Sequence, residues 1–108
     1  LQKIVKDWNV QLDFASNGEE AVAMIEANNY DLVLMDLQMP VMDGRKATIE
    51  VRKFNQHVPI IALTASTDIS LKIELMAIGM NDYLTKPFNP NELYHKLEST
   101  INQSLIVA

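Results

Sequence analysis

The sequence predicts an open α/β fold in which helices alternate with parallel strands. Short apolar or alternating runs recur along the chain, and segments with helical periodicity lie between them. Strands separated by helices pair in parallel, and strands that are apolar throughout belong to a sheet covered on both faces. With 108 residues, the chain is long enough for one domain with a single core.

The first half of the chain contains two predicted strands. Residues 10–15 alternate apolar and polar side chains, as a half-buried strand does. The tetrad Ser16–Glu19 has the form of a capping box, so a helix is predicted to follow it and to end at Asn28–Asn29. Residues 30–35 are a second strand with a continuous apolar stretch, and Gly44 precedes a helix that runs to about Phe54.

The second half repeats this alternation. Residues 58–63 are apolar throughout and predict a buried strand. A helix is predicted from about Asp68 to Gly79, because glycine is the common residue just past a helix end. Residues 82–85 are a short strand, and Pro90 opens a last helix that runs to about Ile101.

Three polar side chains follow predicted strands at the point where each strand ends. They are Asp36, Thr64 and Lys86. Functional sites of open parallel sheets lie beyond the carboxyl ends of the strands, so these side chains are predicted to share one edge. A carboxylate can attack phosphorus and form an acyl phosphate, while an ammonium and a hydroxyl hold the phosphoryl oxygens. Each residue alone is more typical of an ordinary turn or strand end, and only the three together, at three strand ends in order, favour a functional site.

The motifs around these residues resemble those of receiver domains of two-component response regulators. The segments DLQMPVMDG, PIIALTA and DYLTKPF occur in that order, and their style is most similar to receivers of hybrid histidine kinases. The resemblance covers the chain to about Asn102 and implies an open, doubly wound parallel sheet of the flavodoxin-like, receiver type. Residues 1–108 are therefore interpreted as a single receiver domain.

The resemblance assigns a role to five residues. It implies that Asp36 accepts the phosphoryl group, that Thr64 is the switch hydroxyl and that Lys86 pairs with the phosphoryl group. Tyr83 stands where the family has its rotating aromatic side chain. Gln38 stands where a backbone carbonyl contributes, with Asp36, to the magnesium site.

The N-terminus departs from the family pattern. Receivers begin with a strand that ends in two acidic residues, which hold Mg²⁺ together with the phosphoacceptor. This sequence opens at LQKIVKDW, which is interpreted as the second half of the following helix. One carboxylate and one carbonyl are a weak ligand set for a hard divalent cation, so Mg²⁺ binding is predicted to be weak or absent.

Two functions follow from these observations. The first is a phosphorelay receiver that takes a phosphoryl group from a phosphohistidine onto Asp36 and switches conformation. The alternative is a degenerate pseudo-receiver, a protein-binding module that works without phosphorylation. In either case the chain is predicted to be a cytoplasmic signalling domain rather than an enzyme, with a histidine kinase or histidine phosphotransfer domain as partner for the first.

The charge and composition of the chain argue against several other classes of protein. The net charge of −5 argues against nucleic acid as a partner, and no apolar run approaches the ~20 residues of a membrane span. The sequence contains no cysteine, so a thiolate metal site and a disulfide framework are excluded.

The helix predicted over residues 68–80 has two apolar sides, one more than a core needs. One side carries Ile69, Ile73 and Met76, and the other carries Leu71, Leu75 and Ile78. Met76 and Met80 are predicted to face outward near Tyr83, where a partner or a second copy of the chain could bind.

The last residues, 104–108, raise a further possibility. The missing first strand of such a sheet is central, between the strands that begin at Val10 and Tyr30. Leu105–Val107 is an apolar, β-prone run that could fill this slot, in its own molecule or in a second one as a swapped dimer. The alternative is that the true first strand precedes Leu1 and that residues 104–108 are a frayed end or linker.

Overall fold

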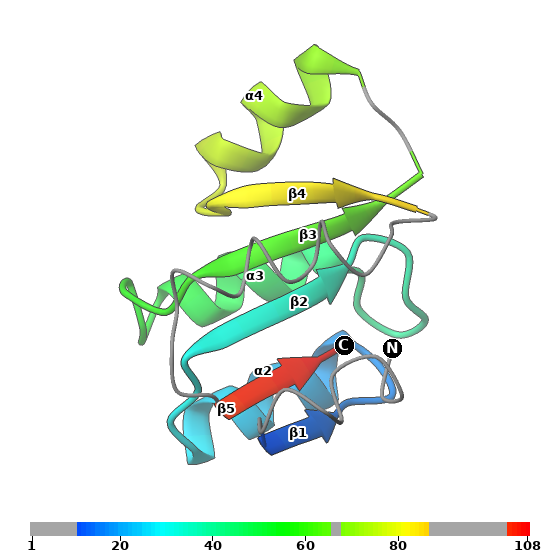
Figure 1. Ribbon diagram of the computed structural model, residues 1–108. Coiled ribbons are helices and arrows are strands. Elements are labelled where there is room, and N and C mark those ends of the chain that lie inside the picture. The colour runs from blue at the N-terminus through cyan, green and yellow to red at the C-terminus, as the bar shows by residue number, and fades with distance from the viewer. Residues whose placement is uncertain (1–10, 66–67, 87–103) are drawn as a thin grey trace.

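The computed structural model describes residues 11–65, 68–86 and 104–108. Within these residues, five strands form one sheet in the order β1-β5-β2-β3-β4, and every pair of neighbours is parallel (Figure 1). The predicted open, parallel α/β fold is therefore confirmed. The helices predicted before Val10 and from Pro90 to Ile101 lie outside the described residues.

The elements follow the predicted order with small shifts at their ends. The strands are β1 (Gln11–Phe14), β2 (Leu32–Asp36), β3 (Ile60–Thr64), β4 (Asp82–Thr85) and β5 (Ser104–Val107). The helices are α2 (Gly18–Ala27), α3 (Gly44–Arg52) and α4 (Ile69–Ala77). Figure 1 shows α2 and α3 on one face of the sheet, with α4 beside β4.

The middle strands are buried because their side chains are apolar on both faces. Every residue of β3 is buried, and so is every residue of β2 except Asp36 at its end. Each of the helices α2 and α3 packs one apolar face into the core. The residues are Ala21 and Ile25 of α2 and Ala47 and Val51 of α3. The continuous apolar runs thus form strands that are covered on both sides.

The C-terminal segment is the interior strand β5, second from the β1 edge of the sheet. It pairs with β1 on one side and with β2 on the other. The ladder ends in three backbone hydrogen bonds: Ala15 N–H donates to Val107 O (2.9 Å), Ala108 N–H to Leu34 O (2.9 Å) and Asp36 N–H to Ala108 O (2.8 Å). Ile106 is fully buried. A frayed end or linker does not describe this segment, because its backbone groups find ladder partners on both sides.

The N-terminus of α2 differs from the predicted capping box by one residue. The N-cap is Asn17, whose side chain accepts the backbone N–H of Glu20, and the carboxylate of Glu20 accepts the N–H of Ser16. Asparagine caps as well as serine does, and placing it at the cap puts both Glu19 and Glu20 in the first turn. Both glutamates then lie at the positive end of the helix dipole.

The end of α4 follows the prediction at Gly79 and contradicts it at Met80. Gly79 has φ of 111°, and the N–H groups of Gly79 and Met80 donate to the carbonyls of Met76 and Leu75. This is the Schellman arrangement, in which the residue after the glycine turns back toward the helix. Met80 therefore joins Leu75 in the core and is only 3% exposed, so its predicted outward position is wrong.

Arg52, at the end of α3, fixes the loop that connects α4 to β4. Its Nε and Nη2 both donate to Gly79 O, at 2.9 and 2.8 Å, and Nη1 donates to Asn55 O at 3.1 Å. Burial lowers the pKa of Arg52. The guanidinium supplies donors for the backbone carbonyls of Gly79 and Asn55, which lie where the chain turns after a helix.

Tyr30, just before β2, is bonded to the edge strand β1. Its hydroxyl donates to Asp13 Oδ2 at 2.7 Å. Burial, followed by the hydrogen bond and the charge of Asp13, raises the pKa of Tyr30 to about 12. The contact links the two strands that flank β5.

The raised pKa of Tyr30 predicts a loss of stability at high pH. The neutral phenol stabilises the fold fully below about pH 10, the pKa of an unfolded tyrosine, and this stabilisation is lost as pH rises toward about 12. Denaturant unfolding across this interval should show the free energy of unfolding falling more steeply in the wild type than in Tyr30→Phe. Equal slopes in the two proteins would contradict the assignment.

Candidate functional site

Backbone hydrogen bonds align the carboxyl ends of β2, β3 and β4. Leu37 N–H donates to Leu63 O at 3.2 Å, and Lys86 N–H donates to Thr64 O at 2.7 Å. These bonds continue the ladder by one residue beyond β2 and β4. Asp36, Thr64 and Lys86 consequently lie at the same edge, as the sequence predicted.

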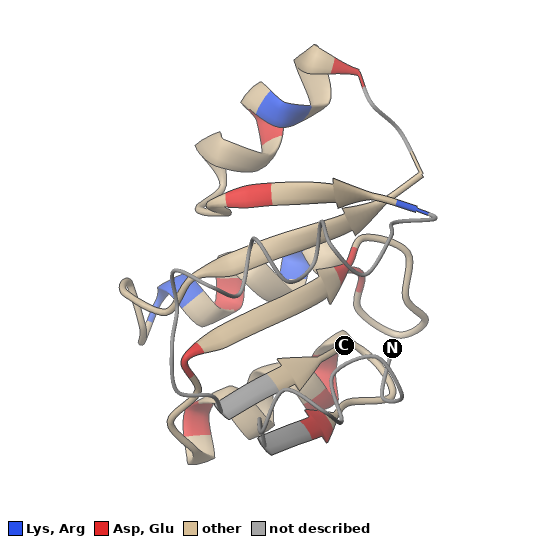
Figure 2. Cartoon of the chain, viewed as in Figure 1, with Lys and Arg blue, Asp and Glu red and all other residues tan. Residues whose placement is uncertain are grey.

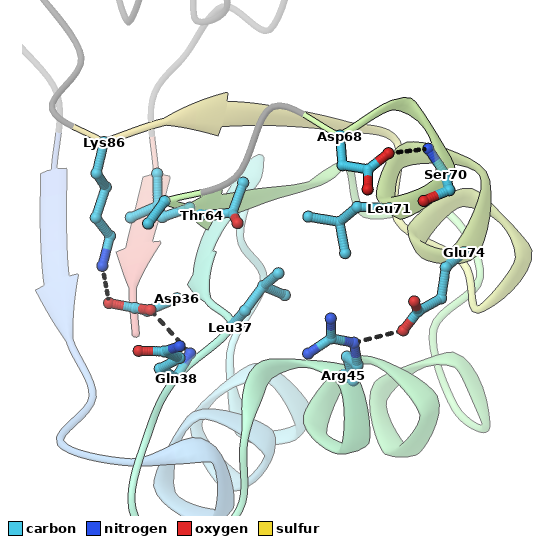
Figure 3. Close-up of a pocket in the computed structure, with 12 residues that line it drawn as sticks. Asp36, Leu37, Gln38, Arg45, Thr64, Asp68, Ser70, Leu71, Glu74 and Lys86 are labelled. Carbon is cyan, nitrogen blue, oxygen red and sulfur yellow. Dashed lines mark hydrogen bonds and ion pairs between the residues drawn. The ribbon is translucent and has the colours of Figure 1, made fainter.

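Asp36 and Lys86 form an ion pair at this edge. Lys86 Nζ donates to Asp36 Oδ2, and the backbone N–H of Gln38 donates to Asp36 Oδ1 at 2.9 Å (Figure 3). The side chain of Lys86 is 42% exposed and that of Asp36 is 27% exposed. Solvent therefore screens the ion pair, which contributes at most about 1 kcal/mol to stability. The pair orients the carboxylate more than it stabilises the fold. Figure 2 shows the same opposition, with an acidic residue ending β2 and a basic one following β4.

A cleft of about 500 Å³ extends from this pair toward α4. Thr64 lines it from the end of β3, and Figure 3 shows its hydroxyl turned into the cleft. Thr64 is only 6% exposed, so its backbone cannot shift without disturbing the core. The carboxylate, the hydroxyl and the ammonium come from three neighbouring strands, which gives the site a rigid base.

The far end of the cleft contains an ion pair that the sequence did not reveal. Arg45 Nε donates to Glu74 Oε1 at 2.6 Å, which links the first turn of α3 to α4. The two residues are 29 positions apart, so no local pattern marks the pair. The sequence offered one hint that Arg45 lies near the site. It follows Gly44, where the helix begins close to Asp36.

Gly44 is required where α3 begins. A Cβ at this position would lie 2.3 Å from the carbonyl oxygen of Asp36, and Gly44 N–H donates to Leu37 O at 3.3 Å. The loop between them includes Val41 with φ of 67°, bridged by a bond from Met42 N–H to Pro40 O at 2.7 Å. A β-branched residue is strained at this φ, so the loop that follows Asp36 stores local strain.

Tyr83 is placed differently from the other predicted residues. It belongs to β4 and is not among the residues that line the cleft. Lys72 Nζ of α4 lies 5.7 Å from the centre of its ring, within the range of a cation–π contact. Tyr83 therefore connects β4 with α4 rather than with Asp36.

The described residues do not fit a magnesium ion. Mg²⁺ prefers six oxygen ligands in octahedral geometry. At this edge Asp36 is the carboxylate, and its two oxygens already accept from Lys86 and Gln38. Within residues 11–65, 68–86 and 104–108, no group of three His, Cys, Asp or Glu side chains could hold a metal. The two predicted ligands, Asp36 and Gln38, are close together but too few.

An open parallel α/β sheet with a carboxylate, a hydroxyl and an ammonium at one edge defines a class of phosphoacceptor signalling domains. Residues 1–98 match the family model of the response regulator receiver domain. The chain belongs to this family, whose members are phosphoacceptors of two-component signalling. The sequence-based recognition and the receiver fold are confirmed.

Relatives among known proteins include several histidine kinases. The chain is 39% identical over 106 residues to hybrid signal transduction histidine kinase B of Dictyostelium discoideum, covering 86% of the chain and 5% of that protein. It is 38% identical over 98 residues to sensor histidine kinase GacS of Pseudomonas protegens, covering 86% and 11%. The chain thus spans a small part of the length of these relatives.

Solved structures of related proteins have the same fold. One is the receiver domain of sensor histidine kinase PA1611 from Pseudomonas aeruginosa, crystallised with magnesium coordinated in its active site cleft. It has a TM-score of 0.83 and 37% identity, covering 93% of this chain and 84% of that one. The chemotaxis protein CheY4 of Vibrio cholerae has a TM-score of 0.85 and 31% identity, covering 93% and 85%.

Proposed function

We propose that Asp36 is the phosphoacceptor of this receiver domain. A carboxylate oxygen attacks the phosphorus of a phosphohistidine, the new bond to oxygen forms, and the bond from phosphorus to the imidazole nitrogen breaks. Lys86 then pairs with a phosphoryl oxygen, and the hydroxyl of Thr64 donates to another. The convergence of Asp36, Thr64 and Lys86 from three strand ends is the observation that carries the proposal.

The proposed donor is a histidine kinase or a histidine phosphotransfer domain, supported by the kinases among the relatives. We propose that the domain works in the cytoplasm and does not catalyse a reaction of its own beyond its phosphorylation. In the part of the chain that the structure describes, none of the helices has the length and apolarity to cross a membrane. The net charge of −5 supports the proposal that nucleic acid is not a partner.

Magnesium is proposed to bind weakly to the described residues, because Asp36 and the carbonyl of Gln38 supply too few oxygen ligands. The metal would supply charge compensation at the transferred phosphoryl group. Among the described residues, Lys86 provides a positive charge next to the proposed acceptor carboxylate, because it forms an ion pair with Asp36. Thr64 and Tyr83 are proposed to transmit phosphorylation to α4, which Tyr83 contacts through Lys72.

The proposal is tested by phosphoryl transfer. The full chain is incubated with a phosphotransfer protein that carries phosphohistidine, the acyl phosphate is trapped by reduction, and the modified peptide is mapped. The modified residue should be Asp36. A modification on another carboxylate, or none from a donor that phosphorylates a second receiver, would reject the proposal.

The outer side of α4 is proposed as a surface for self-association. Ile69, Ile73 and Met76 are 74%, 68% and 50% exposed, whereas Leu75 on the opposite side is buried. Three exposed apolar side chains on one helix face are typical of an interaction surface. Association here would bring the Met76 positions of two copies together, so Met76→Cys should form a covalent dimer upon oxidation. A purely monomeric product would contradict this contact.

A further inference from the structure

The loop that follows Asp36 carries an exposed apolar side chain. Val41 is 77% exposed, more than any other large apolar residue that the structure describes, and Pro40 beside it is exposed too. Figure 1 shows this loop, between β2 and α3, projecting beyond the end of β2. Single exposed apolar residues are common, so exposure by itself assigns no role to Val41.

The backbone conformation of Val41 is the less common feature. Its φ is 67°, and Met42 N–H donates to Pro40 O at 2.7 Å, which makes a γ-turn of the rare, strained kind. A β-branched residue is an outlier at this φ, whereas glycine or asparagine adopts it at lower cost. The valine therefore costs the free domain some stability. Strained residues of this kind concentrate at active sites and ligand-binding sites.

Two close contacts fix the loop. Gly18 N–H donates to Met42 O at 3.1 Å, and a Cβ on Gly18 would lie 2.0 Å from that oxygen, so the start of α2 packs tightly against the loop. At the other end of the loop, a Cβ on Gly44 would lie 2.3 Å from the carbonyl oxygen of Asp36. The loop is thus held between α2 and the strand end that carries Asp36. A side chain on a fixed loop costs less ordering entropy on binding, which favours affinity.

Three exposed carboxylates lie on the segments that these contacts join. Glu19 and Glu20 follow Gly18 in the first turn of α2, and Asp43 ends the loop as the N-cap of α3. Within residues 11–65, 68–86 and 104–108, none of the ion pairs includes any of the three. The surface is therefore apolar at Val41 and negatively charged beside it. A partner that complements it has an apolar contact flanked by Lys or Arg side chains.

We propose that this surface, made of Val41, Glu19, Glu20 and Asp43, is where the phosphohistidine donor docks. Transfer requires the phosphorus to come within bonding distance of a carboxylate oxygen of Asp36, so a protein donor must cover the side chains that project beside it. The docking surface rests on the proposed function, because it serves transfer to Asp36. It adds the chemistry of the donor, which presents an apolar side chain to Val41 and basic side chains to the carboxylates.

Two phosphoryl donors separate docking from chemistry. One is a histidine phosphotransfer domain that carries phosphohistidine, and the other is acetyl phosphate, which has no protein surface. Val41→Asn removes the apolar contact, adds no charge and suits a positive φ. Labelling of Asp36 in the full-length variant should be about tenfold slower than in the wild type with the protein donor, the usual effect of losing a central interface contact. With acetyl phosphate the two rates should be equal.

Matched controls accompany both features of the surface. Phe54, just past the end of α3, is 41% exposed, and Phe54→Asn should change neither rate. Glu19→Gln should slow transfer from the protein donor by up to about fivefold and weaken its dependence on salt, because it removes one exposed charge pair. Glu26→Gln, in the last turn of the same helix, should do neither.

The outcomes distinguish the docking surface from the proposed function. If Val41→Asn accepts the phosphoryl group from the protein donor as fast as the wild type, the docking surface is overturned. Slowing with acetyl phosphate as well would overturn it, since the substitution would then act on the chemistry at Asp36. Labelling of the wild type by acetyl phosphate alone would overturn it too, because no protein donor would then dock. Absence of label from both donors would instead reject the proposed function, and the docking surface with it.

Discussion

Asp36→Asn is expected to abolish phosphoryl acceptance while leaving the fold intact. An amide has the shape of the carboxylate but does not form an acyl phosphate with a phosphohistidine donor. The substitution removes one partner of an exposed ion pair, so the free energy of unfolding should change by no more than about 1 kcal/mol. Phosphoryl transfer and denaturant unfolding, measured on the same preparation, separate the two effects.

Asp68→Asn is the matched control for this substitution. Asp68 lines the same cleft and caps α4, accepting the N–H of Ser70 at 3.0 Å. Asparagine caps a helix about as well as aspartate, so Asp68→Asn should keep both stability and phosphoryl acceptance. Wild-type labelling of Asp36→Asn would show that another side chain is the acceptor. A loss of labelling in both variants would trace the effect to the charge of the cleft rather than to one nucleophile.

Ile106→Ala is expected to destabilise the domain by about 2–5 kcal/mol, the usual effect of truncating a fully buried isoleucine. Ile106 is in register with Asp13 of β1 and Val33 of β2 and belongs to the hydrophobic core, so the lost methyl groups leave a cavity in the core. Domains of this size have only about 5–15 kcal/mol of stability, and the variant should unfold at clearly lower denaturant concentration.

Ile69→Ala tests whether this loss depends on burial. Ile69 is the same residue type but is 74% exposed on α4, so its truncation should change the free energy of unfolding by less than about 0.5 kcal/mol. Similar losses in the two variants would contradict the interior position of β5. A small loss in both would mean that the C-terminal segment is not part of the core in solution.

Much of the fold followed from local sequence patterns. The apolar runs of β2 and β3, the helical spacing between them and the stop at Gly79 are properties of neighbouring residues. They predict which segments become strands because the period of the apolar residues selects the element that can bury them. The common edge of Asp36, Thr64 and Lys86 was also predictable, since parallel strands align their carboxyl ends.

Other features depended on which distant groups meet. Asn17 rather than the adjacent Ser16 caps α2. Met80 packs into the core rather than facing solvent. Both outcomes depend on how the chain packs and not on the local sequence. Arg45 finds Glu74, and Arg52 finds Gly79, across 29 and 27 positions. Such pairs leave no periodic trace in the sequence, so only the tertiary structure decides them.

The sheet edge that carries Asp36, Thr64 and Lys86 was predicted from the sequence only in part. The groups at this edge were readable from the sequence, because a carboxylate, a hydroxyl and an ammonium each follow a predicted strand. The hydrogen bond from the N–H of Asp36 to the carbonyl of Ala108, at the other end of the chain, was visible only in the tertiary structure. The neighbours of a strand in a sheet depend on which backbone groups elsewhere in the fold remain to be paired, and a short apolar run does not specify them locally.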